Sequence, residues 1–283
     1  MAAELVKQLI DAGVHFGHRA SRWNPKMKPY IFSKRNLIHI INIKETIRGV
    51  LLAKKFIAQV TSEGKDVLLV GTKRQARKAV QDHADRVGMH WVNDRWLGGT
   101  LTNFREIRKR VGRLNELEAM DAAGQLDMYS KKAGSTLRRE MRKIRRNLGG
   151  LRKMEKLPGV IIAIDQNHEL IAVKEANKLD IPVICLLDTD GNPDLVDIPI
   201  PANDDAMRAI DLILKELCDA AAAGVQMRAK LVADDQDGAQ RRRRRRATTA
   251  RADDGKDADI AEIAGEMASE EPPAEPAAPA ENQ

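Results

Sequence analysis

The stretch Val67-Leu68-Leu69-Val70-Gly71-Thr72-Lys73-Arg74 joins a short apolar run to a glycine and then to a basic segment. Four consecutive apolar residues predict a strand that is covered on both faces, which is typical of a parallel sheet. Gly71 and Thr72 predict a turn, and residues 74–87 predict the helix that follows it. A strand, a tight turn and a helix in this order form the repeating unit of an α/β fold.

The same alternation continues on both sides of this stretch. Further strands are predicted at residues 37–43, 90–92, 160–164, 183–187 and 197–200, and helices at residues 4–12, 46–60, 170–179 and 204–223. Asn203 is the predicted cap of the last helix. This order predicts a doubly wound, mainly parallel sheet of the Rossmann or flavodoxin-like class.

Residues 102–156 interrupt the alternation with two helical segments and a polar, glycine-containing reversal between them. Apolar residues recur at steps of three and four in both segments, which predicts a narrow seam like that of a coiled coil. Because each seam can cover only the other helix, we expect an antiparallel hairpin that projects from its parent domain. The seam residues are Phe104, Ile107, Val111 and Leu114 in the first helix, and Leu137, Met141, Ile144, Leu148 and Leu151 in the second.

The outer faces of this hairpin are strongly basic, and only Glu106 and Glu140 lie within the basic blocks. A solvated helix face is the bland interpretation, but such faces usually alternate Glu with Lys. Like charges one turn apart destabilise an isolated helix by about 0.2–0.5 kcal/mol each, and a polyanion would remove that cost. We therefore predict a nucleic-acid interface. Its residues are Arg105, Arg108, Lys109, Arg110, Arg113, Arg138, Arg139, Arg142, Lys143, Arg145 and Arg146.

The charge of the chain is unevenly distributed over its 283 residues. Residues 1–60 carry eleven Lys and Arg against three Asp and Glu, whereas residues 157–230 carry six against thirteen. This asymmetry favours one oriented docking surface. Aromatic residues make up only 3% of the chain, so recognition should depend on backbone and shape more than on base stacking.

Compartment and redox state can also be predicted. Cys185 and Cys218 have no CxxC spacing and lie in apolar segments, so we expect two buried, reduced thiols. Lys7 and Asp11 interrupt the short apolar N-terminal stretch, which argues against a secretory signal, and no run reaches the length of a membrane span. We expect a cytoplasmic protein.

Signals for enzyme chemistry are weak. The turn at Gly71 resembles a phosphate loop because free N–H groups at a helix start can hold a phosphate, yet neither GxGxxG nor GxxxxGK[ST] occurs. An α/β enzyme binding a nucleotide or sugar phosphate at Gly71, with Asp165, Asp188 and Asp190 at the strand ends, is the runner-up interpretation. A scaffold that recruits proteins through the acidic half is a third.

The histidine pair near the N-terminus and the C-terminal segment have distinctive compositions. His15 and His18 are three residues apart but lack a third ligand of convincing spacing, so no metal site and no cofactor are expected. Residues 231–283 contain the arginine run 241–246 and a segment rich in Ala, Glu and Pro, which predicts a disordered tail. The arginine run could be an RNA-binding arm or a charge that the acidic segment partly neutralises.

Several motifs closely resemble the bacterial members of a known family, the second protein of the small ribosomal subunit (ribosomal protein S2). The likeness spans residues 4–225. The motifs are Gly13-Val14-His15-Phe16-Gly17-His18, residues 23–31 (WNPKMKPYI), residues 70–74 (VGTKR), residues 95–99 (RWLGG) with 101–103 (LTN), residues 148–150 (LGG), residues 174–177 (KEAN), residues 181–183 (IPV) and residues 200–206 (IPANDDA).

The resemblance implies a non-catalytic protein on small-subunit ribosomal RNA, without a small-molecule substrate. It also implies neighbouring ribosomal proteins as partners, including the large messenger-binding protein built of OB-folds, which it would help to retain. RNA-facing residues would then include Arg19, Arg22, Lys26 and Lys28, and the basic turn at Lys73 and Arg74 suits a nucleic-acid phosphate as well.

We accordingly divide the chain into four parts. Residues 1–35 form an N-terminal helix and basic loop, residues 36–101 with 157–230 the α/β domain, residues 102–156 the hairpin, and residues 231–283 the charged tail.

Overall fold

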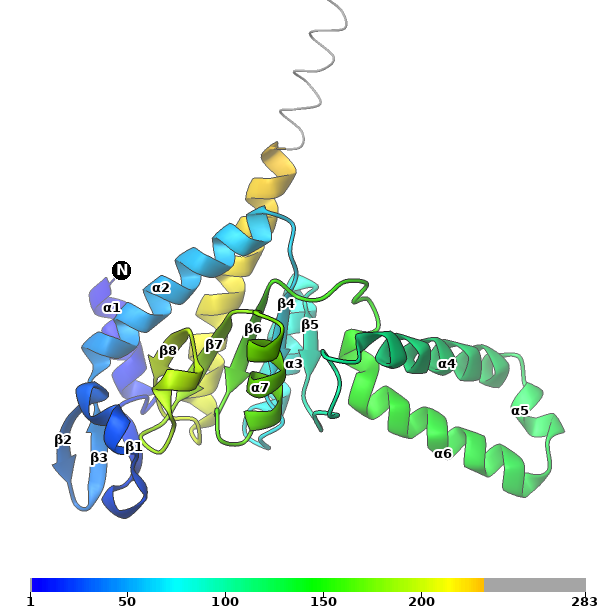
Figure 1. Cartoon of the computed structure of the whole chain (residues 1–283), viewed down its shortest axis with the longest axis horizontal. Helices are drawn as coiled ribbons and strands as arrows, with labels where there is room; N and C mark the ends of the chain where they lie inside the picture. Colours follow the sequence, from blue (N-terminus) through cyan, green and yellow to red (C-terminus); the bar gives the residue numbers. More distant parts are fainter. Residues whose placement is uncertain (1, 232–283) are drawn as a thin grey trace, which may run out of the picture. The chain divides into compact units, whose positions relative to one another are not determined.

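A computed structural model of the chain describes residues 2–231, of which residues up to 228 belong to one compact unit (Figure 1). The predicted tail, including the arginine run 241–246, lies outside the described residues apart from Leu231. No helix within residues 2–231 has the length and apolar character needed to cross a membrane.

The centre of this unit is a five-stranded parallel sheet, as predicted. Its strands are β4 (Val67–Val70), β5 (His90–Val92), β6 (Val160–Ile164), β7 (Val183–Leu187) and β8 (Ile198–Pro201), in the order β5-β4-β6-β7-β8. The connection after β4 leads to one side of the sheet and the connection after β6 leads to the other. The carboxyl ends of β4 and β6 therefore flank the point where a doubly wound fold usually binds its ligand.

Alternate residues of each strand supply two separate apolar layers. Val67 and Leu69 pack in the layer with helices α2 (Ile43–Ser62), α3 (Arg77–Val87) and the helix at residues 207–231. Leu68 and Val70 pack in the layer that includes α7 (Leu170–Lys178) and the base of the hairpin. Both faces of the sheet are thus covered, which explains the wholly apolar strands.

The hairpin forms as predicted and extends away from the sheet (Figure 1). It consists of α4 (Phe104–Ala122), the short helix α5 (Gln125–Met128) and α6 (Lys131–Leu148), followed by the 3-10 turn η3 (Gly149–Leu151). The predicted seam is buried except for Phe104 and Leu137, which are half-buried. Leu117 and Leu126 extend the seam to the tip, where the sequence had predicted only a polar reversal.

The N-terminal region differs from the prediction. After α1 (Ala2–Asp11), the strands β1 (Phe16–Arg19), β2 (Ile31–Arg35) and β3 (Ile38–Ile41) form a separate antiparallel sheet in the order β1-β3-β2. The strand predicted at residues 37–43 therefore does not belong to the parallel sheet. Asn36 and Leu37 adopt positive φ and turn β2 into β3. The two prolines at 25 and 29, which bar an α-helix, are accommodated in the 3-10 helix η2 (Pro25–Tyr30).

Two predicted helix starts are also wrong. Helix α3 begins at Arg77 instead of Arg74, after a turn. The last helix begins at residue 207 instead of 204, because the Asn203 side chain accepts hydrogen bonds from the backbone N–H groups of Asp205 and Ala206 (2.9 and 3.1 Å) and holds a turn there. Cys185 and Cys218 are free and buried, as predicted.

Candidate nucleic-acid interface

Three arginines of the hairpin region are neutralised within the chain. Arg138 on α6 pairs with Asp121 and Asp127, and Arg145 and Arg152 both contact Glu118 on α4, at 2.9 and 2.7 Å. We predicted few acidic partners for the hairpin cations, and for these residues that prediction is wrong. The carboxylates lie outside the basic blocks of the sequence, so only the folded hairpin brings them close.

Three more cations of the hairpin form exposed ion pairs. Lys109 contacts Glu106 (2.6 Å) and Arg113 contacts Glu116 (3.0 Å), each three residues apart on α4. Arg146 contacts Asp94 at 2.6 Å. The exposed pairs of Lys109 and Arg113 contribute only about 0–1 kcal/mol each, so a phosphate can replace their carboxylates at little cost. Asp94 differs, because its side chain is 14% exposed and it also contacts Arg77 at 2.8 Å.

The other six predicted hairpin cations are exposed and form no ion pair with any residue between 2 and 231. Arg108 donates a hydrogen bond to the Glu155 carbonyl (3.1 Å), which leaves its charge uncompensated. These side chains give the arm its positive surface. They are Arg105, Arg108, Arg110, Arg139, Arg142 and Lys143.

A second basic surface lies on the N-terminal loop and sheet. Arg19, Arg22 and Lys28 are exposed and have no ion pair within the described part of the chain, whereas Lys26 pairs with Asp194. Sequence reasoning did not single out Lys34 and Arg35, which are exposed on β2 in the same sheet. Their only signal was the basic dipeptide itself, because β2 was not predicted.

The turn at Gly71 is closed by the protein's own side chains. The Thr72 N–H and hydroxyl both donate to Glu169 Oε1 at 2.6 Å, where a phosphate-binding loop would hold its ligand. Burial raises the pKa of Glu169, although the hydrogen bonds from Thr72 oppose this. A Cβ at Gly71 would lie 2.8 Å from Val80, so the glycine serves tight packing.

Lys73 is therefore not available to a nucleic-acid phosphate. Its ammonium lies 2.7 Å from both Asp204 and Asp205 and 3.3 Å from Asp165. Burial disfavours the charge, but the hydrogen bonds to Asp204 and Asp205 outweigh it and the pKa of Lys73 is raised. Arg74, next in the chain, is exposed. The ligand crevice of the fold thus contains an internal ion cluster.

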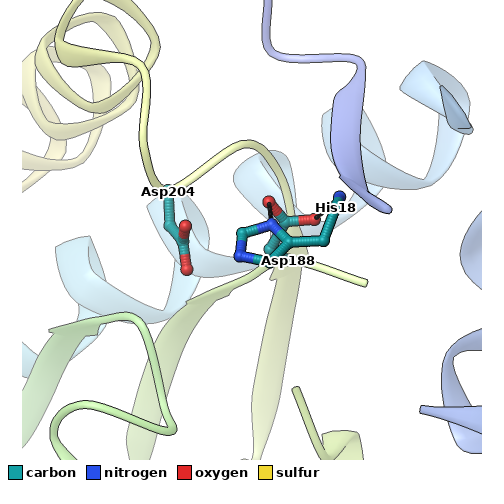
Figure 2. Close-up of side chains that lie close together, drawn as sticks. All are labelled: His18, Asp188 and Asp204. Atoms are coloured by element: carbon teal, nitrogen blue, oxygen red, sulfur yellow. Dashed lines mark hydrogen bonds and ion pairs between the residues drawn. The ribbon is translucent and has the colours of Figure 1, made fainter. Parts of the chain in front are cut away.

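Figure 2 shows the other half of this cluster, where His18, Asp188 and Asp204 meet. Their ligand atoms lie within 4.8 Å of one another. His18 Nδ1 lies 2.8 Å from Asp188, and this hydrogen bond raises the pKa of His18 to about 9. Zinc accepts one imidazole and two carboxylates as ligands, but here the pairing with Asp188 keeps the His18 ring protonated at neutral pH and Lys73 lies 2.7 Å from Asp204, so these side chains neutralise one another.

The three residues come from β1 and from the ends of β7 and β8. No spacing in the sequence could have grouped them, because His18 and Asp188 are 170 residues apart. The histidine pair that the sequence suggested does not form a site: the His15 ring packs against Phe16 with ring centres 4.1 Å apart. Burial raises the pKa of Asp204, and the charge of Asp165 adds to this effect.

One buried carboxylate positions the start of the hairpin. Glu175 on α7 accepts hydrogen bonds from the Trp96 indole and from the backbone of Gly99, Leu101 and Thr102, at 2.7–3.2 Å. Burial opposes its charge, but these donors outweigh that effect and lower the pKa of Glu175. The loop that leads into α4 is therefore held by a single side chain from helix α7, more than 70 residues later in the sequence.

These features define a class of protein. The fold is a doubly wound α/β sheet whose usual ligand crevice is closed by internal ion pairs, and whose exposed charge is carried by a basic loop and a basic helical arm. Such an arrangement presents a charged surface to a large partner, because the crevice at the carboxyl ends of β4 and β6 holds the ion pairs of Lys73 with Asp165, Asp204 and Asp205.

Comparison with known proteins identifies the family. The model of the family "Ribosomal protein S2" matches residues 9–224. A protein named small ribosomal subunit protein uS2 from Rhodopirellula baltica is 56% identical over 224 residues, which cover 79% of this chain and 86% of the relative. Its namesake from Rhodococcus opacus is 46% identical and covers 99% of this chain and 93% of the relative, so that this match extends into the tail. The chain belongs to the ribosomal protein S2 family, and it is a structural protein, not an enzyme.

Proposed function

We propose that the chain is a structural component of the small ribosomal subunit that binds its ribosomal RNA through two basic surfaces. One surface is the N-terminal loop and sheet with Arg19, Arg22 and Lys28, and the other is the hairpin. This function fits a ribosome-bound protein of the cytoplasm. The observation that carries the proposal is the set of exposed hairpin cations that have no ion pair among residues 2–231, in a chain whose relatives are named as small-subunit proteins.

Phosphates would be the main groups recognised. The arm offers guanidinium groups, which bind phosphate through two parallel hydrogen bonds, and it offers few aromatic rings for base stacking. Double-stranded RNA is recognised mostly by its shape and by contacts to phosphates and 2′-hydroxyls. We leave Lys73 out of the proposed contacts because its ammonium faces three carboxylates.

Salt dependence tests this proposal. If the chain contacts six or more phosphates, raising the salt concentration from about 50 to about 200 mM should weaken binding by about three orders of magnitude or more. The measurement is the affinity of the full chain for a transcript of the small-subunit ribosomal RNA at several salt concentrations. An affinity that does not change with salt would refute electrostatic docking.

We further propose that the chain helps to retain the large messenger-binding OB-fold protein, together with other neighbouring ribosomal proteins. This part rests on the resemblance to the family over residues 4–225. Sedimentation of small subunits with and without this chain tests it, with the amount of the OB-fold protein in the particle as the readout. Equal amounts in both particles would contradict retention, without bearing on RNA binding.

A further inference from the structure

The hairpin has a groove on one face near its base. This groove has a volume of about 740 Å³ and lies between α4, α6 and the loop at Leu97, Gly98 and Gly99. Ile107 and Ile144 contribute to its apolar floor. Its volume falls within the range of about 300–1,000 Å³ that is usual for ligand pockets.

The hairpin cations that line the groove differ from those elsewhere on the hairpin in their ion pairs. Arg110, Arg139 and Lys143 line the groove, and none of them has an ion pair among residues 2–231. Glu106 and Glu140 also line the groove, so three cations face two carboxylates and the groove keeps a net positive charge of one. The cations that are neutralised by Glu118, Asp121 and Asp127 are absent from its lining residues.

An unsatisfied polar group adds an independent observation. Asn147 lines the groove, its side chain is 8% exposed, and its Oδ1 has no hydrogen-bond partner within the described residues. A buried acceptor without a donor costs the folded state about 1–3 kcal/mol. A protein that keeps such a group beside an open groove has a place for a ligand that donates a hydrogen bond.

From these observations we infer that the groove receives one unstacked nucleotide of the bound RNA. This inference rests on the proposed function and deepens it by naming the face that docks. The base lies on the apolar floor between the guanidinium groups of Arg110 and Arg139, and an N–H group of the base donates to Asn147. Arg139 and Lys143 neutralise the flanking phosphates.

The chemistry of the groove fits a nucleotide better than an acidic peptide. Unstacked bases in RNA complexes stack on aromatic rings or on the planes of arginine side chains, and this groove has two arginines and no aromatic residue. An acidic peptide would need only the cations. A nucleotide also uses the apolar floor and the amide.

A pair of matched triple variants tests which face docks. The groove variant is Arg110→Gln, Arg139→Gln and Lys143→Gln, and the control is Arg138→Gln, Arg145→Gln and Arg152→Gln. Both lower the net charge by three, so non-specific attraction falls equally. We expect the groove variant to bind the small-subunit ribosomal RNA about tenfold more weakly or worse, with a salt slope smaller by about two. The control should lose less than about threefold.

A single substitution tests the amide. Asn147→Leu has similar volume and removes the unsatisfied oxygen, so its melting temperature should equal or exceed that of the unchanged protein. Its RNA affinity should fall about fivefold or more, the loss expected for one hydrogen bond of about 1 kcal/mol or slightly more. Photo-crosslinking to the same RNA should join a nucleotide to groove residues, and Asn147→Leu should reduce that product.

The outcomes separate this inference from the proposed function. If the unchanged protein does not bind the RNA, the proposed function fails. If it binds and the two triple variants lose affinity equally, or Asn147→Leu binds normally, the groove is not the nucleotide site. If the groove variant binds free RNA normally but is retained poorly on small subunits, the groove receives a neighbouring protein and the inference is overturned.

Discussion

Glu175 and Glu169 are buried carboxylates that have no cationic partner in the described part of the chain, and they hold loops around the crevice. Each accepts hydrogen bonds from N–H and O–H groups of a segment far away in the sequence. Glu169 follows His168 and Glu175 follows Lys174, and these local sequences gave no hint of the role. The N–H donors belong to loops that are distant in the sequence, and only the complete fold brings these loops to the carboxylates.

Glu175→Gln should destabilise the protein by about 2–4 kcal/mol, because a carboxamide turns one acceptor oxygen into an NH₂ group that faces N–H donors. The measurement is urea unfolding followed by circular dichroism. Glu106→Gln, on the exposed face of α4, is the control and should change stability by less than about 0.5 kcal/mol. A Glu175 variant as stable as that control would show that the carboxylate does not hold the loop.

The difference in unfolding free energy between the unchanged protein and Glu169→Gln should depend on pH. Burial raises the pKa of Glu169 in the folded state above its unfolded value, so the folded protein binds the proton more tightly. The contribution of this carboxyl group to stability is therefore present at low pH and is lost as the pH rises through its folded pKa. Gln cannot ionise and still accepts from Thr72.

The stability of the unchanged protein relative to Glu169→Gln should thus fall between about pH 4 and pH 7. Unfolding free energies of both proteins at these two values give the comparison. A difference that stays constant or grows with pH would contradict the raised pKa.

Elements with a strong period were predictable from the sequence. The parallel strands β4, β6 and β7 are wholly apolar, and the hairpin seam repeats at steps of three and four, so local pattern and burial agree. The N-terminal sheet was not predictable in the same way. Strand β2 exposes four of its five residues, and without a buried face it lacks the alternation that identifies a strand.

Two glycines of the hairpin should respond in opposite ways to alanine. Gly112 lies inside α4, and a Cβ there would meet nothing within 4 Å, so Gly112→Ala should stabilise the protein by about 0.5–1 kcal/mol. A Cβ at Gly134 would lie 2.8 Å from the Leu126 carbonyl oxygen, so Gly134→Ala should destabilise the contact between α5 and α6. Thermal unfolding of both variants tests the pair. Stabilisation by both would mean that the tip is loosely packed.

At the scale of the whole molecule, the two sheets are joined by the carboxylate of Asp188. It accepts from the His18 ring at 2.8 Å and from the His18 backbone N–H at 3.2 Å, and it is almost fully buried. Gly17 makes the approach possible, because a Cβ there would lie 2.6 Å from the Thr189 side chain. The sequence predicted strand β7 but placed His18 in a basic loop, and it gave no sign that the two segments touch.

Asp188→Asn should loosen the N-terminal sheet while leaving the hairpin intact, because the amide cannot pair with a protonated His18. Hydrogen exchange should become faster for residues 16–41 and stay the same for residues 104–148. Asp194→Asn is the control, since Asp194 is exposed and, among residues 2–231, forms an ion pair only with Lys26. Equal protection of residues 16–41 in both variants would mean that other contacts join the two sheets.

The two cysteines have a practical consequence. Cys185 and Cys218 are both buried, and burial raises the pKa of Cys218 to about 12, so neither sulfur is a ready nucleophile near neutral pH. The natural chain can therefore serve as its own silent background for maleimide chemistry. A cysteine introduced at an exposed position such as Met128, at the far end of the arm, would carry a fluorophore or spin label alone, and its signal would report directly when that end meets the ribosome.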